Sequence, residues 1–144
     1  MQIIGEYLVA KDWRDVHVGQ FKKRWPNFHP SEFASDDFSL RLNVGFMDKL
    51  QRIRTRAGFP FWVTSGYRTK AHNRRVGGSK NSQHPKGRAG DIALRRLSDG
   101  PKLERLAIQE GMTGIGRYPG KLFIHLDNRV LRRGRNRPAF WGRW

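Results

Sequence analysis

The chain has 144 residues and a mass of 16.8 kDa, which suffices for one compact domain and excludes two substantial cores. Hydrophobic residues make up 37% and aromatic residues 12% of the sequence, which argues against a disordered chain. Lysine and arginine number 29 against 12 acidic residues, a formal net charge of +17, so we expect a negatively charged partner.

The sequence contains no cysteine, which excludes disulfide bonds, thiolate zinc ligands and a cysteine nucleophile. Any metal site must therefore use histidine and carboxylate ligands. Residues 1–15 place Glu6 inside their first apolar stretch and lack the basic and apolar regions of a signal peptide. No apolar run approaches the roughly 18 residues of a membrane span. We expect a protein that is made in the cytoplasm, without its own export signal, and that has no membrane span.

The clearest predicted helix covers residues 43–56. Its apolar side chains recur at intervals of three and four residues, and Gly58 and Pro60 provide a stop signal. Before it, the segment 31–37 has the serine and acidic residues of a turn and a helix start. After it, residues 61–64 form a short strand candidate, followed by an exit loop at 65–68. A second helix is predicted over 101–110, because proline suits a first turn and Gly111 can end a helix.

Two further segments have the alternation of half-buried strands. In 91–94, Asp91 and Ala93 share one face, opposite Ile92 and Leu94. In 122–127, the same rule groups Phe123, His125 and Asp127 opposite Leu122, Ile124 and Leu126. Each strand thus combines an apolar face with a face that carries a polar side chain. The pattern predicts an α+β fold, with a small, mainly antiparallel sheet, helices packed on one side and a metal site at the sheet face.

His84, Asp91 and His125 are the candidate metal ligands. His84 lies in a loop rich in proline and glycine, and Asp91 follows seven residues later at the start of a strand. Two imidazoles and a carboxylate make up a ligand set that zinc accepts, and three protein ligands plus water is the usual catalytic arrangement. The alternative is structural: a solvated loop histidine, an aspartate that caps a strand and a buried, hydrogen-bonded histidine.

A family resemblance favours the metal site. Residues 82–91 match the pattern S-x-H-x-x-G-x-A-x-D of the zinc-dependent D-Ala-D-Ala carboxypeptidase and L-Ala-D-Glu peptidase family, which includes phage endolysins. Residues 65–68, Asn73 and 77–78 resemble the upstream segment of that family, and residues 123–127 are similar to its closing strand. Residues 29–33 are similar to an N-terminal element of one branch. The resemblance spans about residues 28–127, leaving a basic, aromatic tail at 128–144 of a single peptidase domain.

The resemblance implies roles for individual residues. His84, Asp91 and His125 would bind Zn²⁺, which polarises the scissile carbonyl and lowers the pKa of bound water towards about 7. Arg68 would stabilise the oxyanion or bind a carboxylate of the substrate. Tyr67 and Ser82 would take part in substrate binding, with Ser82 also shaping the loop or orienting a ligand.

The residue that handles the proton of the attacking water is not given by the resemblance. Many family members have a carboxylate three residues before the last ligand or a histidine two residues before it, positions that hold Leu122 and Phe123 in this sequence. Asp127 shares a strand face with His125, so it is either the general base or a partner that orients His125. We expect Asp127 to be the catalytic residue that handles the proton. Weaker candidates, more typical of structural roles, are His72 and Glu32; no role is assigned to His17 and His29.

The charge distribution leaves three functions open. Residues 49–90 contain 11 basic residues and no acidic one, and the tail places aromatic residues between arginines. We expect a monomeric zinc peptidase that cleaves a stem peptide or cross-link of peptidoglycan, most simply a phage-type endolysin acting at the cell wall or periplasm after release. Its charge would attract it to an anionic cell envelope, without specific binding of nucleic acid. The alternatives are a nucleic-acid-binding protein and a zinc-containing, inactive wall-binding module.

Overall fold

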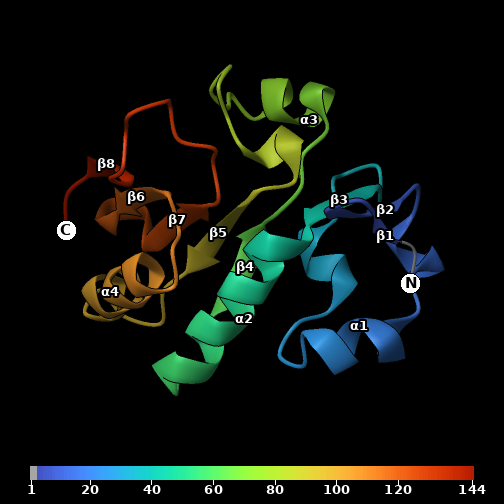
Figure 1. Cartoon of the computed structure of the whole chain (residues 1–144), viewed down its shortest axis with the longest axis horizontal. Coiled ribbons are helices and arrows are strands. Elements are labelled where there is room, and N and C mark those ends of the chain that lie inside the picture. Colours follow the sequence, from blue (N-terminus) through green and yellow to red (C-terminus); the bar gives the residue numbers. More distant parts are fainter. Residues whose placement is uncertain (1–2) are drawn as a thin grey trace.

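Two β-sheets and four α-helices make up the fold in the computed structural model, which describes residues 3–144 (Figure 1). The predicted α+β class is confirmed. Within the described part of the chain, no helix has the length and hydrophobicity needed to cross a bilayer. The α-helices are α1 (Val18–Arg24), α2 (Val44–Ala57), α3 (Lys70–Arg75) and α4 (Asp99–Gln109), and the 3-10 helices are η1 (Trp13–Asp15), η2 (Pro30–Phe33), η3 (His84–Lys86) and η4 (Pro119–Lys121).

The larger sheet has five strands in the order β4-β5-β7-β6-β8. Adjacent strands of this sheet run antiparallel, except that β8 pairs with β6 in parallel. Part of the C-terminal tail is therefore an edge strand of this sheet. A separate antiparallel sheet, β1-β2-β3, was not predicted. The strands are β1 (Ile3–Ile4), β2 (Tyr7–Ala10), β3 (Leu40–Asn43), β4 (Trp62–Ser65), β5 (Ala89–Ala93), β6 (Gly114–Tyr118), β7 (Phe123–Asp127) and β8 (Ala139–Gly142).

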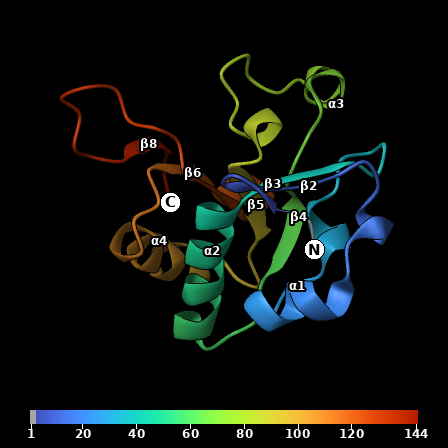
Figure 2. The ribbon, with the colours of Figure 1, turned by 45° about the vertical axis from the view of Figure 1, so that its right-hand side comes forward.

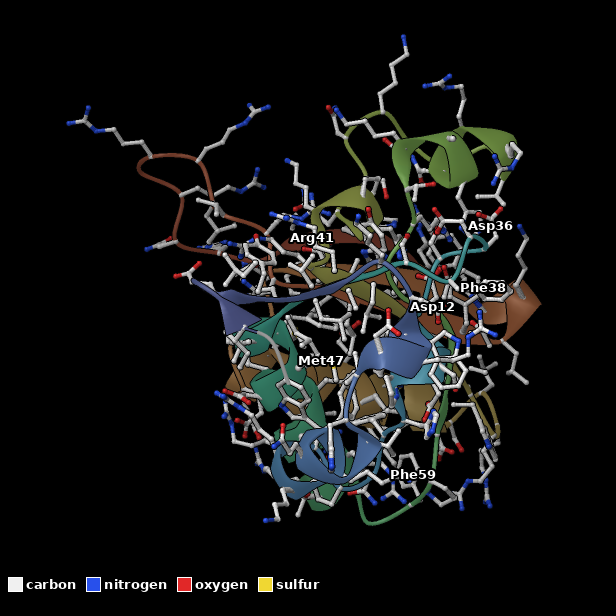
Figure 3. All side chains as sticks on the ribbon, turned by 90° about the vertical axis from the view of Figure 1, so that its right-hand side faces the viewer. Asp12, Asp36, Phe38, Arg41, Met47 and Phe59 are labelled. Atoms are coloured by element: carbon white, nitrogen blue, oxygen red, sulfur yellow. The ribbon has the colours of Figure 1, made fainter. Side chains whose placement is uncertain are left out.

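Helix α2 confirms the strongest periodic pattern of the sequence. The Asn43 side chain caps the helix by accepting a hydrogen bond from the Phe46 backbone at 2.8 Å. Gly58 ends it with a φ of 72°, a left-handed conformation that glycine adopts without strain. Met47 points into the interior, where it is fully buried (Figure 3). Its apolar neighbours on the same helix face, Phe46, Leu50 and Ile53, are fully buried as well.

The apolar face of the five-stranded sheet packs against α2 and α4, which lie side by side in Figures 1 and 2. Ile92 and Ile124 sit opposite one another on β5 and β7, and both are fully buried. Gly90 leaves room for the Phe46 ring, which a Cβ at that position would meet at 3.2 Å. The helices cover this face of the sheet, so the opposite face can carry polar side chains.

Several predicted boundaries were wrong by one or two residues; for example, β4 covers 62–65 rather than 61–64, and β5 begins at Ala89 rather than at Asp91. Helix α4 begins at Asp99 rather than at Pro101, because Asp99 is buried in the first turn and paired with Arg95. Strand β7 begins at Phe123, because Leu122 adopts a left-handed φ of 55° at the end of η4 and is partly exposed. Leu122 therefore does not belong to the apolar face of the strand.

Candidate metal centre

The register of the five-stranded sheet brings Asp91 and His125 together. Asp91 on β5 is the direct cross-strand partner of His125 on β7, and cross-strand partners lie close enough for their side chains to touch. His84 enters from η3, just before β5 begins. Gly87 closes that turn with a φ of 68°, and its carbonyl accepts a hydrogen bond from the Asn43 backbone at 2.8 Å. The loop is thus anchored to β3 and directs His84 over the sheet.

The three predicted ligands form a compact cluster. His125 Nδ1 lies 2.9 Å and His84 Nε2 lies 3.3 Å from Oδ1 of Asp91. One possible ligand atom from each residue lies within 4.8 Å of the others, and within residues 3–144 this is the one group of three or more such side chains placed to hold a metal ion. His84 and His125 are buried and Asp91 is half-buried. This convergence was expected from the sequence.

The hydrogen bonds of the two histidines select the nitrogen that each one offers to a metal. His84 Nδ1 lies 2.6 Å from the carbonyl oxygen of Gly66, which can only accept, so in the neutral, metal-binding ring Nδ1 carries the proton and Nε2 offers its lone pair. His125 Nε2 lies 2.8 Å from Oδ2 of Asp127, which leaves the lone pair on Nδ1. Both free nitrogens face the same oxygen of Asp91. This donor set fits zinc, which binds neutral imidazole and carboxylate ligands.

Asp127 lies behind His125, away from the face on which the three ligands meet. The residue is fully buried and accepts hydrogen bonds from His125 and from the Arg129 guanidinium at 2.9 and 2.7 Å. Burial raises the pKa of Asp127, but the bonds from Arg129 and His125 outweigh it and lower the pKa to about 2. Gly114 opposite is required, because a Cβ there would lie 2.2 Å from the carboxylate. Of the two roles considered for Asp127, this geometry favours the orientation of His125.

The charges of the ligand cluster support one another. Burial raises the pKa of Asp91, but hydrogen bonds from His125 and His84 outweigh it and hold the pKa well below its usual range. Burial lowers the pKa of His125, but Asp127 and Asp91 outweigh it and raise the pKa. Without a metal, the carboxylates therefore attract a cation to this point. A divalent ion would supply that charge with His125 neutral.

A cavity of about 440 Å³ opens over the ligand cluster. Arg68 lines it and is fixed by hydrogen bonds to Oγ of Ser65 at 2.9 Å, Oδ1 of Asn73 at 3.2 Å and Oδ2 of Asp91 at 3.2 Å. A guanidinium has five N–H donors, so two remain for another ligand. The other described lining residues are Gly77, Gly78, Ser79, Asn81, Ser82, Gln83, His84, Asp91, Tyr118, Phe123, His125, Arg129 and Trp141.

The two other predicted substrate-binding residues have different positions. Ser82 lines the cavity, and its Oγ accepts a hydrogen bond from the His84 backbone at 3.2 Å, so it shapes the loop that carries His84. Tyr67 is absent from the lining of the cavity; its backbone N–H donates to the carbonyl of Phe33 at 2.8 Å. Tyr67 therefore links the loop after β4 to η2.

The weaker candidates for proton transfer lie outside the cavity. His72 on α3 contacts Ser35 Oγ at 2.9 Å, and Glu32 accepts a hydrogen bond from the His29 backbone at 2.9 Å. His29 and His17, to which no role was assigned, are the N-caps of η2 and α1. All four side chains therefore stabilise local structure.

Sequence reasoning assigned no place in the site to several residues that line the cavity, among them Tyr118, Arg129 and Trp141. Arg129 and Trp141 lie in the basic, aromatic tail, and the composition of that tail was considered as a sign of nucleic-acid binding. Only the pairing of β8 with β6 places Trp141 beside the ligand cluster. Nothing in the local sequence pattern indicates that parallel pairing.

The comparison with known proteins agrees with this geometry. The family model described as Peptidase M15 matches residues 9–127, which include the three ligands and Arg68. No match was found among curated proteins. Peptidases of this family are zinc-dependent, and the cluster of His84, Asp91 and His125 could hold the metal ion. The chain therefore belongs to the peptidase M15 family, the family of the zinc D-Ala-D-Ala carboxypeptidases.

Proposed function

We propose that this zinc peptidase hydrolyses a peptide bond in bacterial peptidoglycan, as a phage-type endolysin does. The observation that carries the proposal is the ligand cluster at a cavity that also exposes the guanidinium groups of Arg68 and Arg129. Peptidoglycan stem peptides carry carboxylates beside their peptide bonds, and guanidinium groups bind carboxylates in a defined orientation. The substrate is therefore a short, acidic peptide.

Each described residue of the centre has a task in such a reaction. When zinc is bound by His84, Asp91 and His125, it polarises the scissile carbonyl and lowers the pKa of a water molecule towards neutrality. The Gly66 carbonyl and Asp127 hold the two imidazoles in the tautomers that expose their metal-binding nitrogens. Arg68 uses its two remaining N–H donors to bind a substrate carboxylate or the developing oxyanion.

The exposed arginines of the loop before β8 support an envelope location. Figure 3 shows long, nitrogen-tipped side chains that extend from this loop into solvent. In the described part of the chain, Arg132, Arg133, Arg135 and Arg137 form no ion pair with an acidic residue. Unpaired positive charge near the cavity would concentrate the enzyme on an anionic cell envelope. We propose that the protein acts there as a monomer, at the cell wall or periplasm after release.

The test combines zinc analysis with digestion of purified peptidoglycan. We expect about one zinc per chain, release of soluble muropeptides, and new termini in mass spectra that identify the cleaved bond as D-Ala-D-Ala, L-Ala-D-Glu or a cross-link. His84→Ala should lose both zinc and activity. The matched control is His17→Asn, because asparagine also caps helices and His17 lies outside the cavity.

Two results would replace the proposal. Binding of single-stranded DNA with a steep salt dependence, while peptidoglycan stays intact, would indicate the nucleic-acid-binding alternative. A full zinc content with wall binding and no new termini would indicate an inactive wall-binding module.

A further inference from the structure

The segment 128–144 lies beyond the family match, yet it builds one wall of the cavity. The match ends at Asp127, whereas Arg129 and Trp141 both line the cavity. Trp141 is carried by β8, the edge strand that pairs in parallel with β6. The site of this chain is thus completed by residues that the family pattern does not include.

The indole of Trp141 is held in place by Gly116, His125 and Arg129. Gly116 is the cross-strand partner of both His125 and Trp141, and a Cβ at Gly116 would lie 2.4 Å from Nε1 of the indole. The indole therefore lies where a side chain of β6 would otherwise be, with its ring centroid 5.2 Å from that of His125. The Arg129 guanidinium packs over the indole at 5.0 Å. These contacts fix the direction of the indole N–H.

That N–H points at Tyr118. Trp141 Nε1 lies 2.9 Å from the hydroxyl oxygen of Tyr118, and because an indole nitrogen can only donate, the phenol oxygen accepts. The Tyr118 ring stacks on Phe123 with a centroid distance of 4.2 Å and an interplanar angle of 8°. The ring is therefore fixed by stacking and the oxygen by the indole, which leaves the hydroxyl proton as the group free to turn. Within residues 3–144 the hydroxyl makes no hydrogen bond besides the one from Trp141, and Tyr118 lines the cavity.

We propose that Tyr118 is a catalytic residue, which donates a hydrogen bond to the oxyanion that develops on the scissile carbonyl, and that Trp141 is its positioning residue. This inference rests on the proposed peptidase function. The oxyanion is the natural acceptor, since the cavity lining described here contains a single carboxylate, Asp91, and that residue is a ligand. A donor whose oxygen is held in advance costs no reorganisation when charge develops.

The kinetic test removes the hydroxyl and the indole N–H separately. Tyr118→Phe retains the stacking on Phe123, and we expect kcat to fall about 100-fold with KM changed less than about twofold, because the lost bond forms in the transition state. Trp141→Phe retains an aromatic ring beside His125, and we expect a fall of several-fold. If Trp141 acts through Tyr118, it should have no further effect in the Tyr118→Phe background.

The matched control is Trp144→Phe. Trp144 also donates its indole N–H, to Glu104 at 3.2 Å, but lies outside the cavity lining. We expect unchanged kinetics for this variant, and about one zinc per chain for all variants. A Tyr118→Phe enzyme with wild-type kcat would overturn the role of Tyr118. Equal effects of Trp141→Phe in both backgrounds would overturn the positioning role of Trp141.

Two readouts do not require turnover. Hydrogen exchange of the Trp141 indole N–H, followed by NMR in metal-free protein, should speed up in Tyr118→Phe because the acceptor is removed. A phosphinate dipeptide, whose tetrahedral oxygens resemble the oxyanion, should bind zinc-loaded Tyr118→Phe at least tenfold more weakly than wild type, whereas equal affinity would argue against the donor. If wild type leaves peptidoglycan intact yet binds the phosphinate more tightly than Tyr118→Phe does, the proposed substrate is wrong and the role of Tyr118 stands.

Discussion

Replacing Asp127 with asparagine distinguishes its two possible roles. The carboxylate accepts a hydrogen bond from Nε2 of His125 at 2.8 Å, while the opposite nitrogen of that ring faces the metal position. If Asp127 orients His125, Asp127→Asn should weaken zinc binding, because the amide can turn its NH₂ group towards the ring and favour the wrong tautomer. If Asp127 is the general base, the variant should retain zinc and lose only the chemical step.

The magnitude follows from the contacts of the carboxylate. Loss of a partner that orients a metal-bound histidine typically lowers metal affinity 10- to 100-fold. The pKa of Asp127 is lowered from its ordinary value of 3.8 to about 2, which corresponds to roughly 2 kcal/mol of stability for the metal-free chain at neutral pH. We therefore expect Asp127→Asn to lose both zinc affinity and about 2 kcal/mol of unfolding free energy.

The assay measures the zinc dissociation constant by competition with a chelating indicator, and stability by urea unfolding of the metal-free protein. The matched control is Asp99→Asn, since Asp99 is also buried and paired with an arginine, Arg95, but lies on α4. The control should lose stability without losing zinc affinity. An Asp127→Asn variant that binds zinc as tightly as wild type, with kcat reduced 100-fold or more, would refute the orientation role and identify Asp127 as the base.

Three further predictions address the rest of the site. Gly116→Ala should lower kcat and displace Trp141, which would be seen as altered tryptophan fluorescence. The control Gly120→Ala should behave as wild type, because beyond the adjacent residues no atom lies within 4 Å of the new methyl group. Equal behaviour of the two variants would contradict the packing of the indole against Gly116. The stability that Asp127 gives the metal-free chain should be fully present above about pH 4 and lost as the pH falls through about 2. The difference in urea midpoint between wild type and Asp127→Asn should therefore vanish in acid. A difference that stays constant with pH would show that protonation of Asp127 does not control this stability. Replacing Arg132 and Arg133 with glutamine should weaken sedimentation with cell walls at low salt and leave hydrolysis of a soluble muropeptide unchanged; unaltered sedimentation would exclude this loop as the envelope contact.

The ligand set was predicted from the family resemblance together with the strand pattern around two of its members. Alternation along two strands places Asp91 and His125 on their polar faces, and the short loop that carries His84 leads directly into one of these strands. Helix α2 was predictable because its periodicity, cap and glycine stop all lie within one segment. The three-stranded sheet was not, because β1 and β2 are short and β3 pairs with β2 from thirty residues further along the chain.

The contribution of the tail could not be read from the sequence, because its physical meaning depends on one long-range pairing. An arginine-rich segment with tryptophan is typical of a nucleic-acid-binding surface, and composition does not distinguish that use from a strand that joins a sheet. The difference lies in Gly116 on β6, whose missing side chain leaves a space that the Trp141 indole fills. The same packing places an indole N–H donor beside the Tyr118 hydroxyl and a guanidinium beside Asp127. Residues 128–144 therefore pack as part of the peptidase domain, although the family match ends at residue 127.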